Sequence, residues 1–422
     1  MIRSAVSFLA MALSGPMGAG TAHATEPAAV LATYADIAEA TYGDSLGSAQ
    51  ALLAAVETLI ASPSEANLSK ARSAWIAARV PYQQSEVFRF GNPIVDDWEG
   101  RVNSWPLDEG LIDYVETGTA ANEENAFAGL NVIATPVFTL SGHEVDATVI
   151  TPALISETLH EADGIEANVA SGYHAIEFLL WGQDLNGTGP GAGNRPFTDY
   201  VQGDGCTGGN CDRRAAYLKA VTELLVSDLA FMAAAWGETG AARAAVLQDP
   251  ASGLLAMLTG MGSLSYGEQA GERMKLGLML NDPEEEHDCF SDNTHNSHYY
   301  DGLGVQNVYL GHYTRLDGST VSGPSLSDLV AEKAPEVDAQ LTAELASSVA
   351  ALAAIKAAAE DGLAYDQMLE AGNERGEALI MAAVDALVTQ TASIQRAVAV
   401  LGLREVAFEG SDSLDNPSAV FQ

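Results

Sequence analysis

Basic residues and cysteines are scarce in this sequence. Its 422 residues include 19 Lys and Arg against 57 Asp and Glu, a formal net charge of −38, and only three cysteines. Nucleic acids and anionic membrane surfaces need a basic face, so neither is expected as a partner. The acidity suits either a protein that attracts cations or one that is simply very soluble. No uninterrupted apolar run reaches membrane-spanning length, so we expect no span in the mature chain.

The first 24 residues carry the pattern of a cleavable secretory signal peptide. An arginine precedes an apolar run over residues 5–13, and Ala22-His23-Ala24 offers a small-residue cleavage site. No cysteine follows that site, which argues against a lipoprotein anchor. The sequence therefore predicts an exported protein, periplasmic if the source is Gram-negative.

The few cysteines leave two interpretations open. Cys206 and Cys211 flank a short Gly-rich loop, "CTGGNC", and in an oxidising compartment they can close it as a disulfide. A zinc knuckle is the weaker alternative, because a structural zinc site needs four ligands and no second close cysteine pair exists. Cys289 would remain as a free or buried thiol.

Helical periodicity dominates the chain, and strand-like alternation is scarce. Ser62-Pro63 ends one apolar helical stripe, Ser64 or Asn67 can cap the next helix, and Pro81 should kink that second helix. The expected helices cover residues 52–60, 64–90, 156–183, 212–236, 251–280, 325–359 and 365–403.

Two long Gly-rich or polar stretches, residues 185–211 and 282–313, interrupt the helices and are expected to be functional loops. Because the two halves look similarly organised, the sequence predicts an all-α fold of two helical-bundle domains related by duplication. Their predicted bounds are residues 25–240 and 241–410, followed by a flexible tail over residues 411–422.

The stretch "SGYHAIEFLLWGQDLNG", residues 171–187, places His174 and Glu177 three positions apart in an apolar helix. At this spacing the two side chains can converge on one point. They are either a satisfied polar pair in a core or two ligands of a metal. Spacing alone favours the polar pair, because buried polar groups find partners in any case.

A second polar stripe follows "WIAARVPYQQSE", where Trp75, Arg79, Tyr82 and Glu86 fall on one helical face. Its simplest interpretation is an Arg–Glu pair with aromatic packing. Further along, the Trp-Pro of "WPLD" makes a rigid turn that presents Asp108.

These ordered motifs resemble those of the imelysin-like proteins, in particular the iron-regulated protein A subgroup. The carriers are the Trp75 to Glu86 helix, "WPLD", "GYHAIEFLLWGQD" and "EEEHDCFSDNTHNSHYYDG", and the resemblance spans essentially the whole mature chain. It implies two helical-bundle halves exported to the cell envelope. Some members are named for insulin-cleaving peptidase activity and others are tied to iron regulation or uptake.

The family's His-x-x-Glu motif implies a metal site at His174 and Glu177. We expect Glu86 and Asp108, which the other matching motifs present, to be its further ligands. Nitrogen plus carboxylate oxygen suits transition metals, whereas calcium favours oxygen alone. We expect a divalent or ferric ion, with iron favoured and zinc or copper as alternatives.

A second site is conceivable in the other half. Its candidate residues are Glu268, Glu272, Arg273, Asp292 and His295. The alternative is a solvated acidic loop with a few stacking histidines, since spacing within a loop fixes no geometry.

The sequence thus predicts a periplasmic metal-binding protein of iron uptake or homeostasis that delivers its cargo to an envelope iron-transport component. A metal-dependent peptidase is the alternative, although no His-Glu-x-x-His helix is present. A module that binds a polysaccharide or a partner protein is a third reading. A calcium loop at Asp184 is excluded, because its twelfth position is Arg195 and not glutamate.

Overall fold

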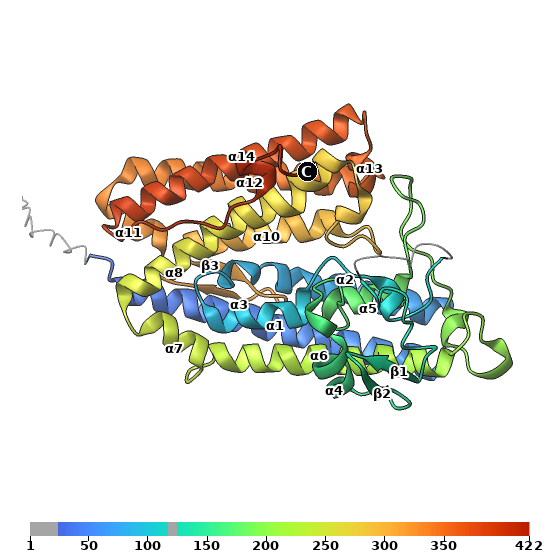
Figure 1. The fold of residues 1–422 in the computed structure, drawn as a ribbon. Coiled ribbons are helices and arrows are strands. Elements are labelled where there is room, and N and C mark those ends of the chain that lie inside the picture. Colours follow the sequence, from blue (N-terminus) through green and yellow to red (C-terminus); the bar gives the residue numbers. More distant parts are fainter. Residues whose placement is uncertain (1–23, 117–124, 422) are drawn as a thin grey trace, which may run out of the picture.

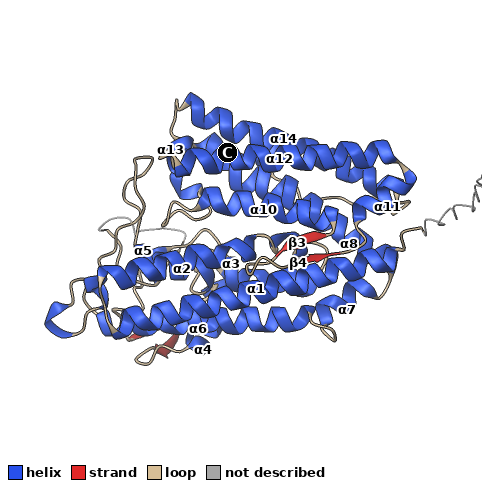
Figure 2. Cartoon of the chain, turned by 180° about the vertical axis from the view of Figure 1, so that it is seen from behind, coloured by secondary structure: helices blue, strands red, loops and turns tan. Residues whose placement is uncertain are grey.

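The chain folds into layers of long helices. The computed structural model describes residues 24–116 and 125–421, so the predicted signal peptide, apart from residue 24, lies outside the described residues. Figure 1 shows α10, α12 and α14 in one layer and α1, α2 and α6 in another. The described strands form only two short hairpins, red in Figure 2, and the predicted all-α class is confirmed.

The layer built from the first half is organised on α1, which packs on α2 and α6. Ser64 caps α2 by accepting a hydrogen bond from the Asn67 backbone N–H at 3.3 Å, as predicted. The helices of this layer are α1 (Pro27–Ala61), α2 (Glu65–Gln83), α3 (Pro93–Asn103), α4 (Pro152–Leu154), α5 (Gly172–Trp181), α6 (Cys211–Trp236) and α7 (Ala241–Leu247).

The second half continues with a helix that changes its winding. An α-helix, α8, passes directly into a π-helix, η7 (Leu264–Leu276), and then into α9. The α-helices of this half are α8 (Pro250–Ser263), α9 (Gly277–Leu280), α10 (Thr294–Leu310), α11 (Leu326–Lys333), α12 (Pro335–Glu360), α13 (Tyr365–Leu369), α14 (Glu374–Val400) and α15 (Asp412–Asp415).

Short elements fill the connections. The hairpins pair β1 (Val137–Leu140) with β2 (His143–Asp146) and β3 (His312–Thr314) with β4 (Thr320–Ser322), both antiparallel. The other single turns are η1 (Glu86–Phe88), η2 (Glu109–Leu111), η3 (Ile155–Leu159), η4 (Ala162–Gly164), η5 (Phe197–Tyr200), η6 (Gly203–Gly205) and η8 (Pro283–Glu285).

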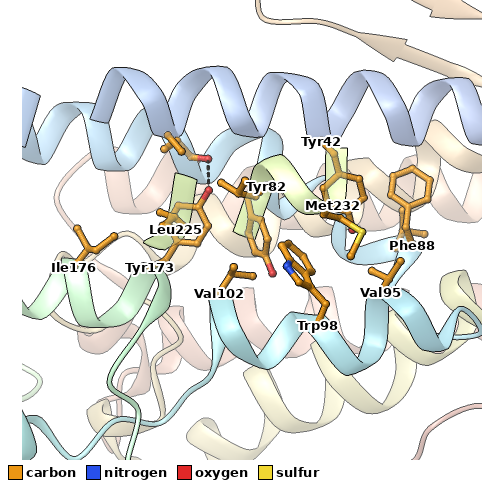
Figure 3. Packing of buried hydrophobic residues seen from close by; sticks show 14 of the residues in the cluster. Tyr42, Tyr82, Phe88, Val95, Trp98, Val102, Tyr173, Ile176, Leu225 and Met232 are labelled. Carbon is orange, nitrogen blue, oxygen red and sulfur yellow. Dashed lines mark hydrogen bonds between the residues drawn. The ribbon is translucent and has the colours of Figure 1, made fainter. Parts of the chain in front are cut away.

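The main core is rich in aromatic side chains. In Figure 3, Tyr42 of α1, Tyr82 of α2, Trp98 of α3 and Tyr173 of α5 meet in it. The Tyr82 and Tyr173 ring centroids lie 4.8 Å apart and those of Tyr42 and Trp98 5.9 Å apart, distances at which aromatic pairs stabilise a core beyond the area they bury. The same cluster extends to Leu341 of α12, so it crosses the predicted boundary at residue 240. The division into two duplicated domains stays a prediction.

One predicted feature of the first half is corrected. The helix expected over residues 156–183 is broken, because Glu161 and Asp163 have positive φ angles of 51° and 60°. Only α5 remains α-helical there. It begins at Gly172, whose φ is +80° and where a Cβ would stand 2.4 Å from the Val102 carbonyl oxygen, so only glycine fits.

The second half differs from prediction in two places. The stretch over residues 282–313, expected to be irregular, contains the buried helix α10. The tail, expected to be flexible, forms α15 against η7, where the Ser413 hydroxyl donates to the Gly271 carbonyl oxygen at 3.0 Å and Tyr266 donates to Asp415 at 2.7 Å.

Two helices, α12 and α14, are long and apolar enough to cross a membrane by length and composition, a test that core helices also pass. In this fold they pack on each other, α12 packs on α10, and α14 packs on η7. Leu352, Ile380 and Leu387 belong to the second buried cluster that they form.

Candidate metal centre

A buried cluster of His174, His287 and Asp288 lies where the two halves of the chain meet. One potential ligand atom from each residue lies within 4.8 Å of the others. His174 comes from α5, while His287 and Asp288 come from the segment between η8 and α10. All three side chains are at most 2% exposed.

Glu177 joins α5 to that segment. One carboxylate oxygen, Oε2, lies 3.1 Å from His174 Nδ1. The other, Oε1, accepts hydrogen bonds from the Ser291 backbone N–H at 3.0 Å and the Ser291 hydroxyl at 2.6 Å. These contacts orient the imidazole and leave His174 Nε2 without a hydrogen-bond partner among the described residues.

Asp288 is fixed from several sides. It accepts a hydrogen bond from Arg79 of α2 at 2.7 Å and one from Asn293 at 2.9 Å, and the Ser297 hydroxyl donates a third. Its Oδ1 lies 3.9 Å from His174 Nδ1. The carboxylate is therefore held beside the imidazole by groups that all favour its charged form.

His287 is positioned by contacts with other rings and not by hydrogen bonds to its nitrogens. Its ring meets that of His174 edge-on with centroids 4.9 Å apart, and Trp105 packs against it at 5.6 Å. The Trp105 indole N–H donates to the Glu286 backbone oxygen at 2.8 Å, which anchors the tryptophan. Both His287 ring nitrogens lack a hydrogen-bond partner in the part of the chain that the structure describes.

Burial keeps both histidines neutral. Burial, with a smaller contribution from the Arg79 charge, lowers the pKa of His174 to about 3. Burial and the Arg273 charge hold the pKa of His287 well below its usual value. Near neutral pH each ring therefore keeps a lone pair that a metal can use.

The two carboxylates of the centre behave differently. Burial and the charge of Asp288 raise the pKa of Glu177 well above its usual range. Burial also opposes ionisation of Asp288, but Arg79, together with the other charges and hydrogen bonds around it, keeps the pKa of Asp288 below its usual value. Asp288 is thus the charged carboxylate of the cluster.

The centre faces a cavity of about 490 Å³ whose wall includes His174, Asp108 and Cys289. Asp108 was predicted as a ligand. It lies on this wall, where its carboxylate accepts a hydrogen bond from Asn125 and its backbone N–H donates to the Ala167 carbonyl oxygen at 2.9 Å. It does not belong to the close cluster.

Glu86 was also predicted as a ligand, but it follows α2 in η1 and pairs with Arg273 at 2.8 Å. It connects to the centre only indirectly. Asn103 lies 3.5 Å from Glu86, with its amide N–H directed at the carboxylate, and accepts from Arg79 at 2.7 Å. The Arg–Glu pair expected within one helix is therefore wrong, because Arg79 binds Asp288.

The second predicted site does not assemble as a unit. Arg273 contacts Glu268 at 2.7 Å, but Glu272 lines a surface cleft beside α15. His295 contacts its neighbour Asn296, and no hydrogen bond or ion pair joins His295 or Asp292 to Arg273 in the described ranges. Metal binding by the first predicted ligand set, which includes Glu86 and Asp108, and by this second set stays a prediction.

The sequence reasoning missed His287 and Asp288 as ligands. It placed them in an acidic, histidine-rich loop but could not tell which histidine turns inward. The sequence feature that could have indicated them is that the two residues are adjacent. They form a His-Asp pair directly before a polar segment that proves to be helical.

The two cysteines of the Gly-rich loop are joined, as the first interpretation predicts. Cys206 and Cys211 form a disulfide with a Cα–Cα distance of 5.9 Å, and Cys289 is free.

Fold and site together define an all-helical protein with a buried histidine–carboxylate centre shared by both halves of the chain. The family model described as Imelysin, also designated Peptidase_M75, matches residues 38–394. The chain therefore belongs to the imelysin family, and the resemblance seen in the sequence is confirmed.

Individual relatives agree with this. Iron-regulated protein A of Synechococcus elongatus is 30% identical over 84 residues, which cover 20% of this chain and 24% of that protein. This chain thus aligns with about a quarter of that relative.

Two solved structures share the fold. One, described as an iron-regulated protein A precursor from Parabacteroides distasonis, has a TM-score of 0.64 at 21% identity and covers 90% of this chain and 97% of its own. An imelysin-like protein from Psychrobacter arcticum has a TM-score of 0.58 at 16% identity, with coverage of 90% and 99%.

Proposed function

We propose that the protein is an exported metal-binding protein that captures iron for uptake or homeostasis. The observation that carries the proposal is the cluster of His174, His287 and Asp288, whose potential ligand atoms lie within 4.8 Å of one another. Unpartnered imidazole nitrogens in a buried site are costly unless something binds them.

The residues fit a first-row transition metal. Two imidazoles and one carboxylate are a donor set that iron(II), zinc and copper all accept, and iron is favoured because relatives carry the name iron-regulated protein A. His174 would bind such a metal through its unpartnered Nε2, while Glu177 holds Nδ1. A carboxylate on the far nitrogen is the usual support of a metal-binding histidine.

The adjoining cavity suits capture and release, because it leaves room for water or a second ligand beside His174. The predicted signal peptide and the net charge of −38 support export and cation attraction. An envelope iron-transport component would then receive the cargo.

Titration of the purified protein with Fe²⁺ under anaerobic conditions and with Zn²⁺, followed by calorimetry, tests the site. We expect the double variant His174→Ala, His287→Ala to lose the tight site. The matched control is His143→Ala, His312→Ala, which removes two exposed histidines and should bind as the wild type does. Equal binding by all three proteins would refute the assignment.

A metal-dependent peptidase is the second candidate, favoured by the designation of the family and by a cavity large enough for a peptide side chain. The cation at the centre would polarise a peptide carbonyl that lies in that cavity. Incubation with an unfolded polypeptide, with and without chelator, separates the two. Chelator-sensitive cleavage that disappears in His174→Ala, His287→Ala would favour the peptidase.

A further inference from the structure

A second group of unpartnered polar atoms lies beside the metal centre, where the segment before α10 meets α13. Glu286 is 1% exposed and Asp366 is 2% exposed. Glu286 Oε1 and both carboxylate oxygens of Asp366 have no hydrogen-bond partner among the described residues. Leaving such groups buried without a partner is unfavourable, so their persistence needs a physical reason.

Both carboxylates face the same small cavity of about 10 Å³. Three further acidic side chains complete its acidic wall: Glu109, Asp184 and Glu284. The volume equals about one water-sized sphere, so a single ion or water molecule fits.

Within the described ranges, no lysine or arginine forms an ion pair with these acids. The buried arginines are engaged elsewhere: Arg79 with Asp288, Arg195 and Arg214 with Asp113, and Arg273 with Glu86, Glu268 and Asp301. Burial and neighbouring carboxylates also raise the pKa of Glu284 to about 7, and burial raises that of Asp366 to about 6. A water molecule donates hydrogen bonds here but compensates no charge, whereas a bound cation compensates the carboxylates that stay ionised.

We propose that Glu286 and Asp366 are the protein ligands of a second cation site made of oxygen ligands alone, with Asp184, Glu284 and Glu109 on the surrounding wall. Among the described residues no three of these carboxylates bring their oxygens within 4.8 Å of one another, so the wall acids attract the cation and draw closer only when it binds. Such a set favours hard cations such as Ca²⁺, Mn²⁺ or Fe³⁺ over the metals that select imidazole. It differs from the His174 centre in donor chemistry, so the two sites are separable by the choice of ion.

The two cavities are contiguous. The small one shares Glu109, Asp184, Glu284, Cys289 and Phe290 with the 490 Å³ cavity that reaches His174. A cation held at the oxygen site therefore lies beside the cavity that reaches His174. Its role as a loading position rests on the proposed function, whereas the oxygen site itself does not.

Terbium(III) is a suitable probe, because it prefers oxygen ligands and two aromatic donors stand beside the site. The Trp105 indole is hydrogen-bonded to the Glu286 backbone at 2.8 Å, and Tyr365 directly precedes Asp366. Aromatic excitation should give sensitised emission from Tb³⁺ bound there.

The experiment titrates Tb³⁺ into wild type and three double variants. Glu286→Gln, Asp366→Asn should bind at least about tenfold more weakly, since it removes ligand charge. Glu238→Gln, Asp385→Asn removes two exposed acids and should match the wild type, as should His174→Ala, His287→Ala. Melting curves should show Glu286→Gln, Asp366→Asn at least as stable as the wild type, because it removes uncompensated buried charge.

Wild-type Tb³⁺ affinity in Glu286→Gln, Asp366→Asn would overturn the oxygen site. Loss of Tb³⁺ binding in both this variant and His174→Ala, His287→Ala would also overturn it, because it would show one shared site.

Zn²⁺ calorimetry separates the oxygen site from the proposed function. If Zn²⁺ does not bind the histidines but Tb³⁺ binding persists, the proposed function fails and the oxygen site stands. For the loading role, stopped-flow mixing should show slower Zn²⁺ association in Glu286→Gln, Asp366→Asn at unchanged affinity, and an unchanged rate would refute that role.

Discussion

At the scale of single residues, the centre depends on how neighbouring side chains divide their hydrogen bonds. Glu177 and Arg79 hold His174 and Asp288 in place, yet ring nitrogens of the two histidines find no hydrogen-bond partner in the described part of the chain. A buried polar atom without a partner costs about 1–3 kcal/mol. A histidine kept for packing alone would gain by finding a partner, so the pattern favours ligand binding.

Arg79 is expected to be essential to the metal-free fold. Replacing it as Arg79→Met leaves the fully buried Asp288 carboxylate without its counter-charge. Breaking a buried pair from one side costs about 3–5 kcal/mol. Chemical denaturation of the metal-free protein should show this loss in the free energy of unfolding.

The matched control is Lys219→Met, which removes exposed pairs with Glu57 and Glu223. Surface ion pairs contribute about 0–1 kcal/mol, so this variant should unfold almost as the wild type does. If Arg79→Met cost no more than Lys219→Met, Asp288 would not carry the charge assigned to it.

At the scale of elements, α10 reaches its place because it carries glycine. A Cβ at Gly304 would stand 2.6 Å from the Gln84 carbonyl oxygen, just after α2 ends. Gly304→Ala should therefore destabilise the protein by about 1–3 kcal/mol, as overpacking does. In contrast, Gly47 in α1 has nothing within 4 Å of its Cβ position, so Gly47→Ala should stabilise by about 0.5–1 kcal/mol.

Urea denaturation of the two alanine variants measures this difference. Both substitutions add the same methyl group within a helix, so intrinsic propensity cancels between them. Equal effects would show that α10 does not approach the end of α2 as closely as described.

A pH effect is expected at Asp228 of α6. Burial raises its pKa from 3.8 to about 6. Because the folded pKa lies above the unfolded one, the protonated form stabilises the fold, and this contribution is lost as pH rises from about 4 through about 6. Asp228→Asn should flatten the stability profile across that window, while Asp212→Asn at the exposed start of α6 should not. An unchanged slope in Asp228→Asn would contradict the assignment.

Part of the helical content is readable from the sequence, since apolar stripes and the Ser64 cap mark α2 and α6. Of α1, which spans Pro27–Ala61, the expected helix over residues 52–60 covers only the last part. Residues 156–183 do not form the single helix that their apolar period predicts, because the period persists through Glu161 and Asp163, whose backbone is left-handed. The helix α10 was missed for a different reason. Its buried face carries glycines, polar groups and a histidine, which look like a loop until α2 and α12 are placed against it.

At the scale of the whole molecule, the centre joins segments more than a hundred residues apart. The pair His174 and Glu177 could be predicted because helical spacing alone brings them together. The approach of His287 and Asp288 could not, since it depends on how the loop before α10 packs on α5 and α2. For the same reason Glu86, which lies one turn beyond Tyr82 by sequence spacing, turned out to face Arg273 instead.

The central claim is that a metal binds between the two halves of the chain. Crystals soaked anaerobically with Fe²⁺ test it most directly, through anomalous diffraction at the iron edge. We predict one strong peak at about 2 Å from a ring nitrogen of His174, a ring nitrogen of His287 and an oxygen of Asp288, the usual range for such ligands. Strong anomalous density elsewhere, with no peak among these three side chains, would contradict the account.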